Sequence, residues 1–90
     1  MAAPAVTLEQ LLPETAVLGE TWARECAAEL RAQKRGVVGA WPGTLSEARS
    51  RVLAAHRTML GTEILQQLAR ATYDVARRSW HVMSEPDLEP

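Results

Sequence analysis

Apolar side chains recur at every fourth position in the first half of the chain, which is the spacing that places them on one face of a helix. These positions are Leu18, Trp22, Cys26 and Leu30. A second row, of small residues at the same spacing, lies beside the first: Gly19, Ala23 and Ala27. Small side chains would let another helix approach closely. The pattern predicts a helix over residues 13–35.

Proline and glycine mark the ends of this helix. Thr7 and Gln10 have the spacing of a capping box, which predicts a short helical turn over residues 8–12. Pro13 lacks the amide hydrogen that an interior helical residue donates, so we expect it to begin a new helix. At the other end, Gly36 suits the left-handed conformation that commonly terminates a helix.

The next segment, residues 36–43, connects two predicted helices. It contains three glycines and one proline, which interrupt regular structure. Trp41 is an apolar side chain within this connection, so we expect it to fold back over the end of the helices. Thr44 and Glu47 have capping-box spacing directly before an amphipathic run, which predicts Thr44 as the N-cap of the second helix.

The second amphipathic run predicts a helix over residues 45–82. Its first half carries one apolar stripe, formed by Leu45, Ala48, Val52, Ala55 and Met59. Its second half is apolar over a wider arc. The two helices together predict an all-α fold, a long helical hairpin. Gly61 is the weak point, because glycine costs about 1 kcal/mol relative to alanine inside a helix. A break there would instead produce a three-helix bundle.

The unequal lengths of the two predicted helices indicate self-association. At 1.5 Å per residue, the first spans roughly 34 Å and the second roughly 57 Å, so half of the second extends beyond the first. That half is the more apolar one, and a second copy of the chain would remove it from water. We therefore expect a two-fold dimer that forms a four-helix bundle. Its expected interface contains Leu60, Ile64, Leu65, Leu68, Ala71, Val75 and Trp80.

Composition limits the range of functions. Ninety residues make one domain, and we expect disorder at its ends, residues 1–6 and 84–90. The net charge is −1, so no global charge attracts nucleic acid or an anionic membrane. Cys26 is the single cysteine and lies on an apolar stripe, so we expect a buried, unreactive thiol. Without a signal-peptide pattern or a long apolar run, a cytoplasmic protein is expected. The abundance of Ala and Arg is typical of a GC-rich bacterial genome.

One metal site deserves consideration. Glu25 and Glu29 share a face of the first helix, and a bundle could bring them to His56. Carboxylates and histidines from facing helices bind metals in other bundles. We favour an ordinary ion pair with Arg51 or Arg57 over this metal-binding alternative, and we expect no metal and no cofactor.

The leading hypothesis for function is a non-enzymatic helical module that associates with itself and acts as an adaptor or regulator of a protein partner. The runner-up is a small nucleic-acid-associated protein that uses the arginine-bearing face of the second helix. We do not favour it, because acidic side chains interrupt the arginines of this face: Arg49, Arg51, Arg57, Arg70, Arg77 and Arg78.

Overall fold

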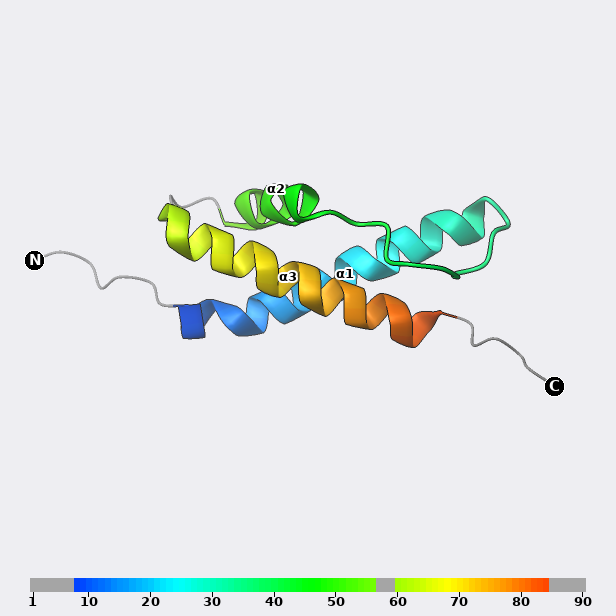
Figure 1. The fold of residues 1–90 in the computed structure, drawn as a ribbon, viewed down its shortest axis with the longest axis horizontal. Coiled ribbons are helices and arrows are strands. Elements are labelled where there is room, and N and C mark those ends of the chain that lie inside the picture. Colours follow the sequence, from blue (N-terminus) through cyan, green and yellow to red (C-terminus); the bar gives the residue numbers. More distant parts are fainter. Residues whose placement is uncertain (1–7, 57–59, 85–90) are drawn as a thin grey trace, which may run out of the picture.

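Three α-helices, with no strand, form the part of the chain that the structure describes, residues 8–56 and 60–84 of a computed structural model. They are α1 (Leu8–Ala32), α2 (Leu45–Ala55) and α3 (Thr62–Met83). α1 and α3 run in the same direction and cross, while α2 runs back along them (Figure 1). The predicted all-α class is confirmed. The disorder expected at residues 1–6 and 85–90 lies outside the described residues, whereas Ser84 caps α3 by donating its amide to the Trp80 carbonyl.

The second amphipathic run folds as two helices. α2 ends at Ala55 and is capped by His56, whose amide donates to the Val52 carbonyl at 2.9 Å. α3 begins after Gly61, whose extended backbone occupies the N-cap position. The prediction of one continuous helix over residues 45–82 is therefore wrong, and the three-helix alternative is confirmed. An unbroken helix would carry the apolar second half into water, whereas the break turns it back onto α1.

The row of small residues on α1 faces α3. Gly19, Ala23 and Ala27 are all buried, and Gly19 lies directly against Val75 and the backbone of Thr72. The prediction that this row admits another helix at close range is confirmed. The helix that it admits is α3 of the same chain.

α1 continues through Pro13 without a break, so the prediction of a separate turn over residues 8–12 is wrong. A proline at position 13 removes the hydrogen bond to the carbonyl of Glu9. Both residues are exposed, so water can satisfy that carbonyl. Thr7, which was expected to form a capping box with Gln10, lies outside the described residues.

The C-terminal end of α1 is closed by Lys34. Lys34 has a φ of 59°, its amide donates to the Arg31 carbonyl at 2.9 Å, and the Arg35 amide donates to the Leu30 carbonyl at 2.8 Å. This pair of hydrogen bonds is the Schellman motif. The prediction that Gly36 takes the left-handed conformation is wrong, because α1 ends at Ala32 and the left-handed residue is Lys34, two positions before Gly36.

Thr44 is the N-cap of α2, as predicted. Its hydroxyl accepts a hydrogen bond from the Glu47 amide at 3.1 Å, and its amide donates to Glu47 Oε1 at 3.0 Å. Both halves of the capping box are thus formed, which satisfies two backbone donors that the helix itself leaves unpaired.

The core consists of two clusters along the bundle. One is aliphatic and lies near the start of α1, with Leu11, Val52, Leu65 and Leu68 buried in it. The other lies near the end of α1 and combines small residues with tryptophans; it includes Trp22, Ala23, Ala27, Val37, Trp41, Ala48, Ala76 and Trp80. Each cluster draws on all three helices, so the core belongs to a three-helix bundle rather than to a hairpin.

Candidate functional site

Three tryptophans meet where the connection between α1 and α2 crosses the bundle. The ring centroids of Trp22 and Trp41 are 4.8 Å apart with planes at 78°, an edge-to-face arrangement. Trp41 and Trp80 are 5.5 Å apart with planes at 59°. All three are buried, so the expectation that Trp41 folds back over the helices is confirmed.

Two glycines fit the connection onto these rings. A Cβ atom on Gly43 would clash with the Trp41 ring and would lie 2.6 Å from Cζ2 of Trp22. Gly39 has a φ of 87°, and its carbonyl accepts a hydrogen bond from Nε1 of Trp80 at 3.0 Å. The glycines of this connection therefore serve its packing against the helices.

A charged bridge joins α1 to α2 beside the tryptophans. Arg51 pairs with Glu25 at 3.0 Å, and its guanidinium carbon lies 5.2 Å from the centroid of the Trp22 ring. The predicted ion pair between a glutamate of α1 and Arg51 is confirmed, while Arg57 lies outside the described residues. This guanidinium is used in holding the two helices together.

Cys26 borders a pocket of about 450 Å³ between α1 and the connection, lined also by Glu29, Arg35, Pro42 and Trp80. Its side chain is partly buried rather than enclosed. Burial raises the pKa of the Cys26 thiol above its usual value, and this outweighs the opposing effect of Arg51. The thiol is therefore held in its protonated, weakly nucleophilic form.

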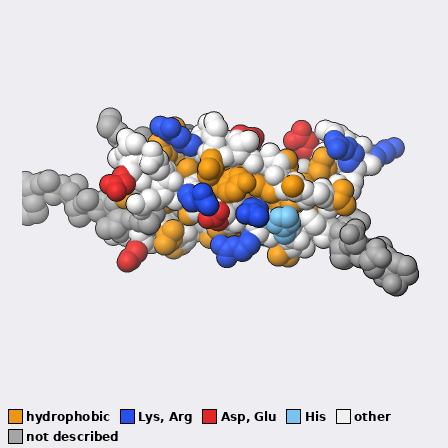
Figure 2. Space-filling model, viewed as in Figure 1, with side chains coloured by type: hydrophobic (Ala, Val, Ile, Leu, Met, Phe, Trp, Pro, Cys, Tyr) orange, Lys and Arg blue, Asp and Glu red, His pale blue; other side chains and the backbone are white. Residues whose placement is uncertain are grey.

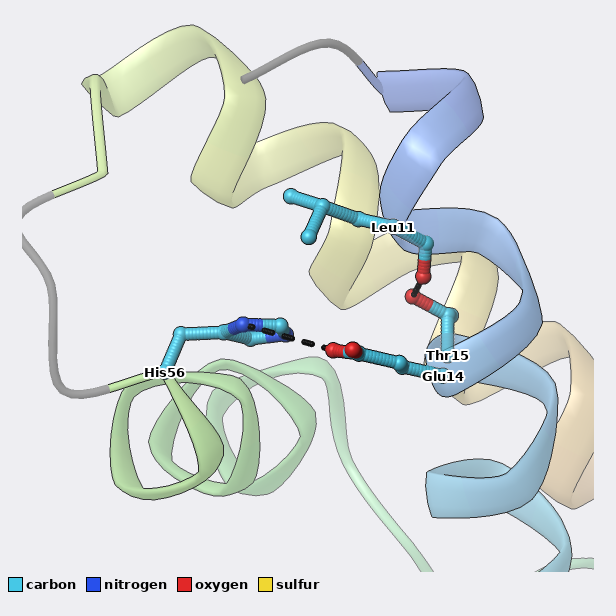
Figure 3. Close-up of polar contacts among 4 residues, drawn as sticks. All are labelled: Leu11, Glu14, Thr15 and His56. Atoms are coloured by element: carbon cyan, nitrogen blue, oxygen red, sulfur yellow. Dashed lines mark hydrogen bonds and ion pairs between the residues drawn. The ribbon is translucent and has the colours of Figure 1, made fainter. Parts of the chain in front are cut away.

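His56 faces α1, where its Nδ1 lies 3.8 Å from Oε2 of Glu14 (Figure 3). The imidazole is largely buried, whereas the Glu14 carboxylate is exposed. The neighbouring Thr15 donates its hydroxyl to the Leu11 carbonyl at 2.9 Å and takes no part in the pair. The distance is longer than a hydrogen bond, so the contact between His56 and Glu14 is an electrostatic one that depends on protonation of the imidazole.

The structure does not assemble the metal site that the sequence left open. His56 lies against Glu14, and Glu25 pairs with Arg51, which separates the residues of that alternative. Across residues 8–56 and 60–84, no group of three or more His, Cys, Asp or Glu side chains is placed to hold a metal ion.

The residues that were expected to form an oligomer interface are buried or partly buried within the single chain. Leu65, Leu68 and Trp80 are buried in the core of the single chain. The others are partly buried, namely Leu60, Ile64, Ala71 and Val75. The premise that this set lies beyond the reach of the first helix is wrong, because the break near Gly61 lays α3 along α1. Five of its side chains have intramolecular packing partners, namely Leu60, Ile64, Leu65, Leu68 and Trp80.

A groove of about 450 Å³ runs between α1 and α3 and involves no residue of α2. Its lining is apolar at Ala16, Val75, Val82 and Met83, and charged at Glu20, Arg24 and Arg78. Val82 is 84% exposed, and Val17, one turn before Glu20 on α1, is 62% exposed. Among the described residues, no ion pair engages Glu20, Arg24 or Arg78. This groove, with its exposed valines, is the candidate interaction surface of the molecule.

The apolar stripes did not identify this surface. Val17 and Val82 lie outside them, so the hydrophobic pattern predicts no role for these residues. The available signal was weak: Val17, Glu20 and Arg24 follow the i, i+3, i+7 spacing of one helix face, and so do Val75, Arg78 and Val82. Such a signal becomes visible only when the relative placement of α1 and α3 is known.

The basic side chains of α3 are mixed with acidic ones. Arg70 pairs with Asp74 at 3.5 Å, and the same carboxylate lies in a small hollow with Arg77, Arg78 and His81. In Figure 2 an acidic side chain interrupts the basic ones that gather over α3. The structure therefore shows no uninterrupted basic stripe on the described part of α3 for a phosphate backbone to follow.

No family model, curated protein or solved structure matches this chain. None of the helices in the described part of the chain combines the length and the apolar character needed to cross a membrane.

Proposed function

We propose that this chain is a non-enzymatic helical module that acts by associating with a second copy of itself. The observation that carries the proposal is the groove between α1 and α3, whose lining includes the exposed Val82. Val17 is also exposed on α1, one turn before the lining residue Glu20. Exposed apolar side chains gathered beside a groove favour contact with another protein surface.

The contacts made by Arg51, Trp80 and Cys26 support a binding role over a catalytic one. Arg51 is engaged with Glu25 and Trp22, and Nε1 of Trp80 donates to a backbone carbonyl. The raised pKa of the Cys26 thiol disfavours the thiolate that nucleophilic chemistry requires. Arg51 and Trp80 thus stabilise the bundle, whereas the groove presents apolar side chains together with charged ones that form no ion pair among the described residues.

Sedimentation equilibrium of the full chain tests the proposal. We expect a mass that rises from one to two chains as the protein concentration is raised through the micromolar range. A mass that stays at one chain over this range, with circular dichroism showing a folded helical protein, would contradict the proposed function.

A further inference from the structure

We infer that the second copy docks antiparallel on the α1–α3 groove, with a two-fold axis that passes between Glu20 and Arg24, so that Glu20 of each copy faces Arg24 and Arg78 of the other. This inference rests on the proposed self-association and adds the surface, the orientation and the pairing residues. Its basis is the order in which charged and apolar side chains follow one another along the groove.

The parallel packing of α1 and α3 determines which residues are level with each other. Gly19 lies opposite Thr72 and Val75. About five residues, or roughly 8 Å, further along both helices, Arg24 on α1 comes level with Arg78 on α3. Glu20 is therefore on one side of the groove's midpoint, and the two arginines are together on the other side.

A two-fold rotation about this midpoint exchanges opposite charges. Glu20 and Arg24 are about 6 Å apart along the helix axis, so an axis halfway between them brings Glu20 of one copy to the level of Arg24 and Arg78 of the other. Two equivalent clusters form, each with one carboxylate between two guanidinium groups. A guanidinium group donates the hydrogen bonds that a carboxylate accepts, so this pairing fixes the orientation of the two copies.

The same rotation places the exposed valines at the rim of the contact. Val17 lies roughly 8 Å before the midpoint, and Val82, which is level with the turn after Arg24, lies roughly 8 Å beyond it. The rotation lays α1 on α1 and α3 on α3 of the partner, so each valine lies at the rim of the contact on its own helix. Antiparallel docking also opposes the aligned dipoles of α1 and α3 in the two copies. A parallel arrangement would instead place the arginines of the two copies together.

Charge reversal tests the pairing. Glu20→Arg should leave only like charges at the contact, and the double variant Arg24→Glu/Arg78→Glu should do the same with opposite sign, so each should raise the dimer dissociation constant about tenfold or more. An equimolar mixture of the two should recover a dimer that contains one chain of each, detected by native mass spectrometry. Glu29→Arg makes the same charge change on α1 away from the groove and should dimerise like the wild type.

Substitution of the two valines tests the same surface without changing the charge of the protein. Val17→Ser/Val82→Ser should weaken dimerisation at unchanged melting temperature, whereas Val38→Ser, at a position that is 61% exposed in the connection, should not. A wild-type dimer that neither Glu20→Arg nor the valine pair weakens would overturn this surface and leave the proposed function in place. A mixture that fails to form the mixed dimer would overturn the antiparallel pairing. A monomeric wild type would overturn both proposals.

Discussion

Gly19 and Val75 mark the point at which α1 and α3 cross. A Cβ atom added to Gly19 would lie 2.8 Å from Cβ and from Cγ1 of Val75, and 2.9 Å from the carbonyl oxygen of Thr72. Real side chains do not approach this closely, so the two helices would have to move apart. The close crossing therefore requires the absence of a side chain at position 19.

Gly19→Ala should destabilise the protein although alanine favours helix. The gain in helix propensity is about 1 kcal/mol, and overpacking of a tight core contact costs about 1–3 kcal/mol, so we expect a lower free energy of unfolding in urea. Val75→Ala in the same chain should remove part of the added cost. Thr21→Ala, at an exposed position of α1, is the control and should be slightly stabilising. A Gly19→Ala variant more stable than the wild type would show that the crossing is looser.

Lys34→Gly should stabilise the protein by about 1 kcal/mol, because a residue with a side chain is strained at positive φ and glycine is not. Thermal unfolding would measure the change. Gly36→Ala separates this structure from the sequence-based expectation, since Gly36 lacks a positive φ and its added Cβ would meet only Cγ1 of Val38 at 3.7 Å. Gly36→Ala should be neutral or mildly stabilising. A marked loss of stability would indicate that Gly36, rather than Lys34, has the left-handed conformation.

Trp80→Phe should cost more stability than Trp41→Phe. Nε1 of Trp80 donates to the Gly39 carbonyl, whereas Nε1 of Trp41 is buried without a hydrogen-bond partner among the described residues. Both changes lose similar apolar volume, but only the first leaves a carbonyl unpaired, which predicts a difference of about 1 kcal/mol in denaturant unfolding. Equal losses, or a larger loss at Trp41, would contradict the hydrogen-bond assignment.

Cys26 should react slowly with iodoacetamide in the folded protein at neutral pH and faster in denaturant, because burial raises the pKa of its thiol. The raised pKa also has a consequence for stability. Below the ordinary pKa of a thiol, Cys26 is protonated in both the folded and the unfolded chain, and its contribution to the free energy of unfolding is complete. As the pH rises above that pKa, the thiol of the unfolded chain ionises first. The free energy of unfolding therefore falls until the thiol of the folded protein also ionises. Cys26→Ser should remove this part of the alkaline decline. Equal labelling rates in folded and unfolded protein would refute the assignment.

Features that depend on residues within a turn or two of each other could be predicted from the sequence. The helical class follows from the apolar periodicity, and the start of α2 follows from the Thr44–Glu47 box, whose donors and acceptors lie three residues apart. The close-packing face formed by Gly19, Ala23 and Ala27 was also predictable, because small residues permit close approach of any helix that packs there.

Tertiary structure alone decided which helix uses that face, where the second run breaks and where α1 ends. The sequence permitted either a continuous helix or a break near Gly61. The break is favoured because it allows α3 to bury apolar surface against α1. The residues that contribute this burial are distant from Gly61 in the chain. Lys34 is left-handed because the connection must turn there to bury Val37 and Trp41. The α1–α3 groove likewise exists only because the two helices run in parallel at one register, which brings Glu20 near Arg78 although local spacing relates neither residue to the other.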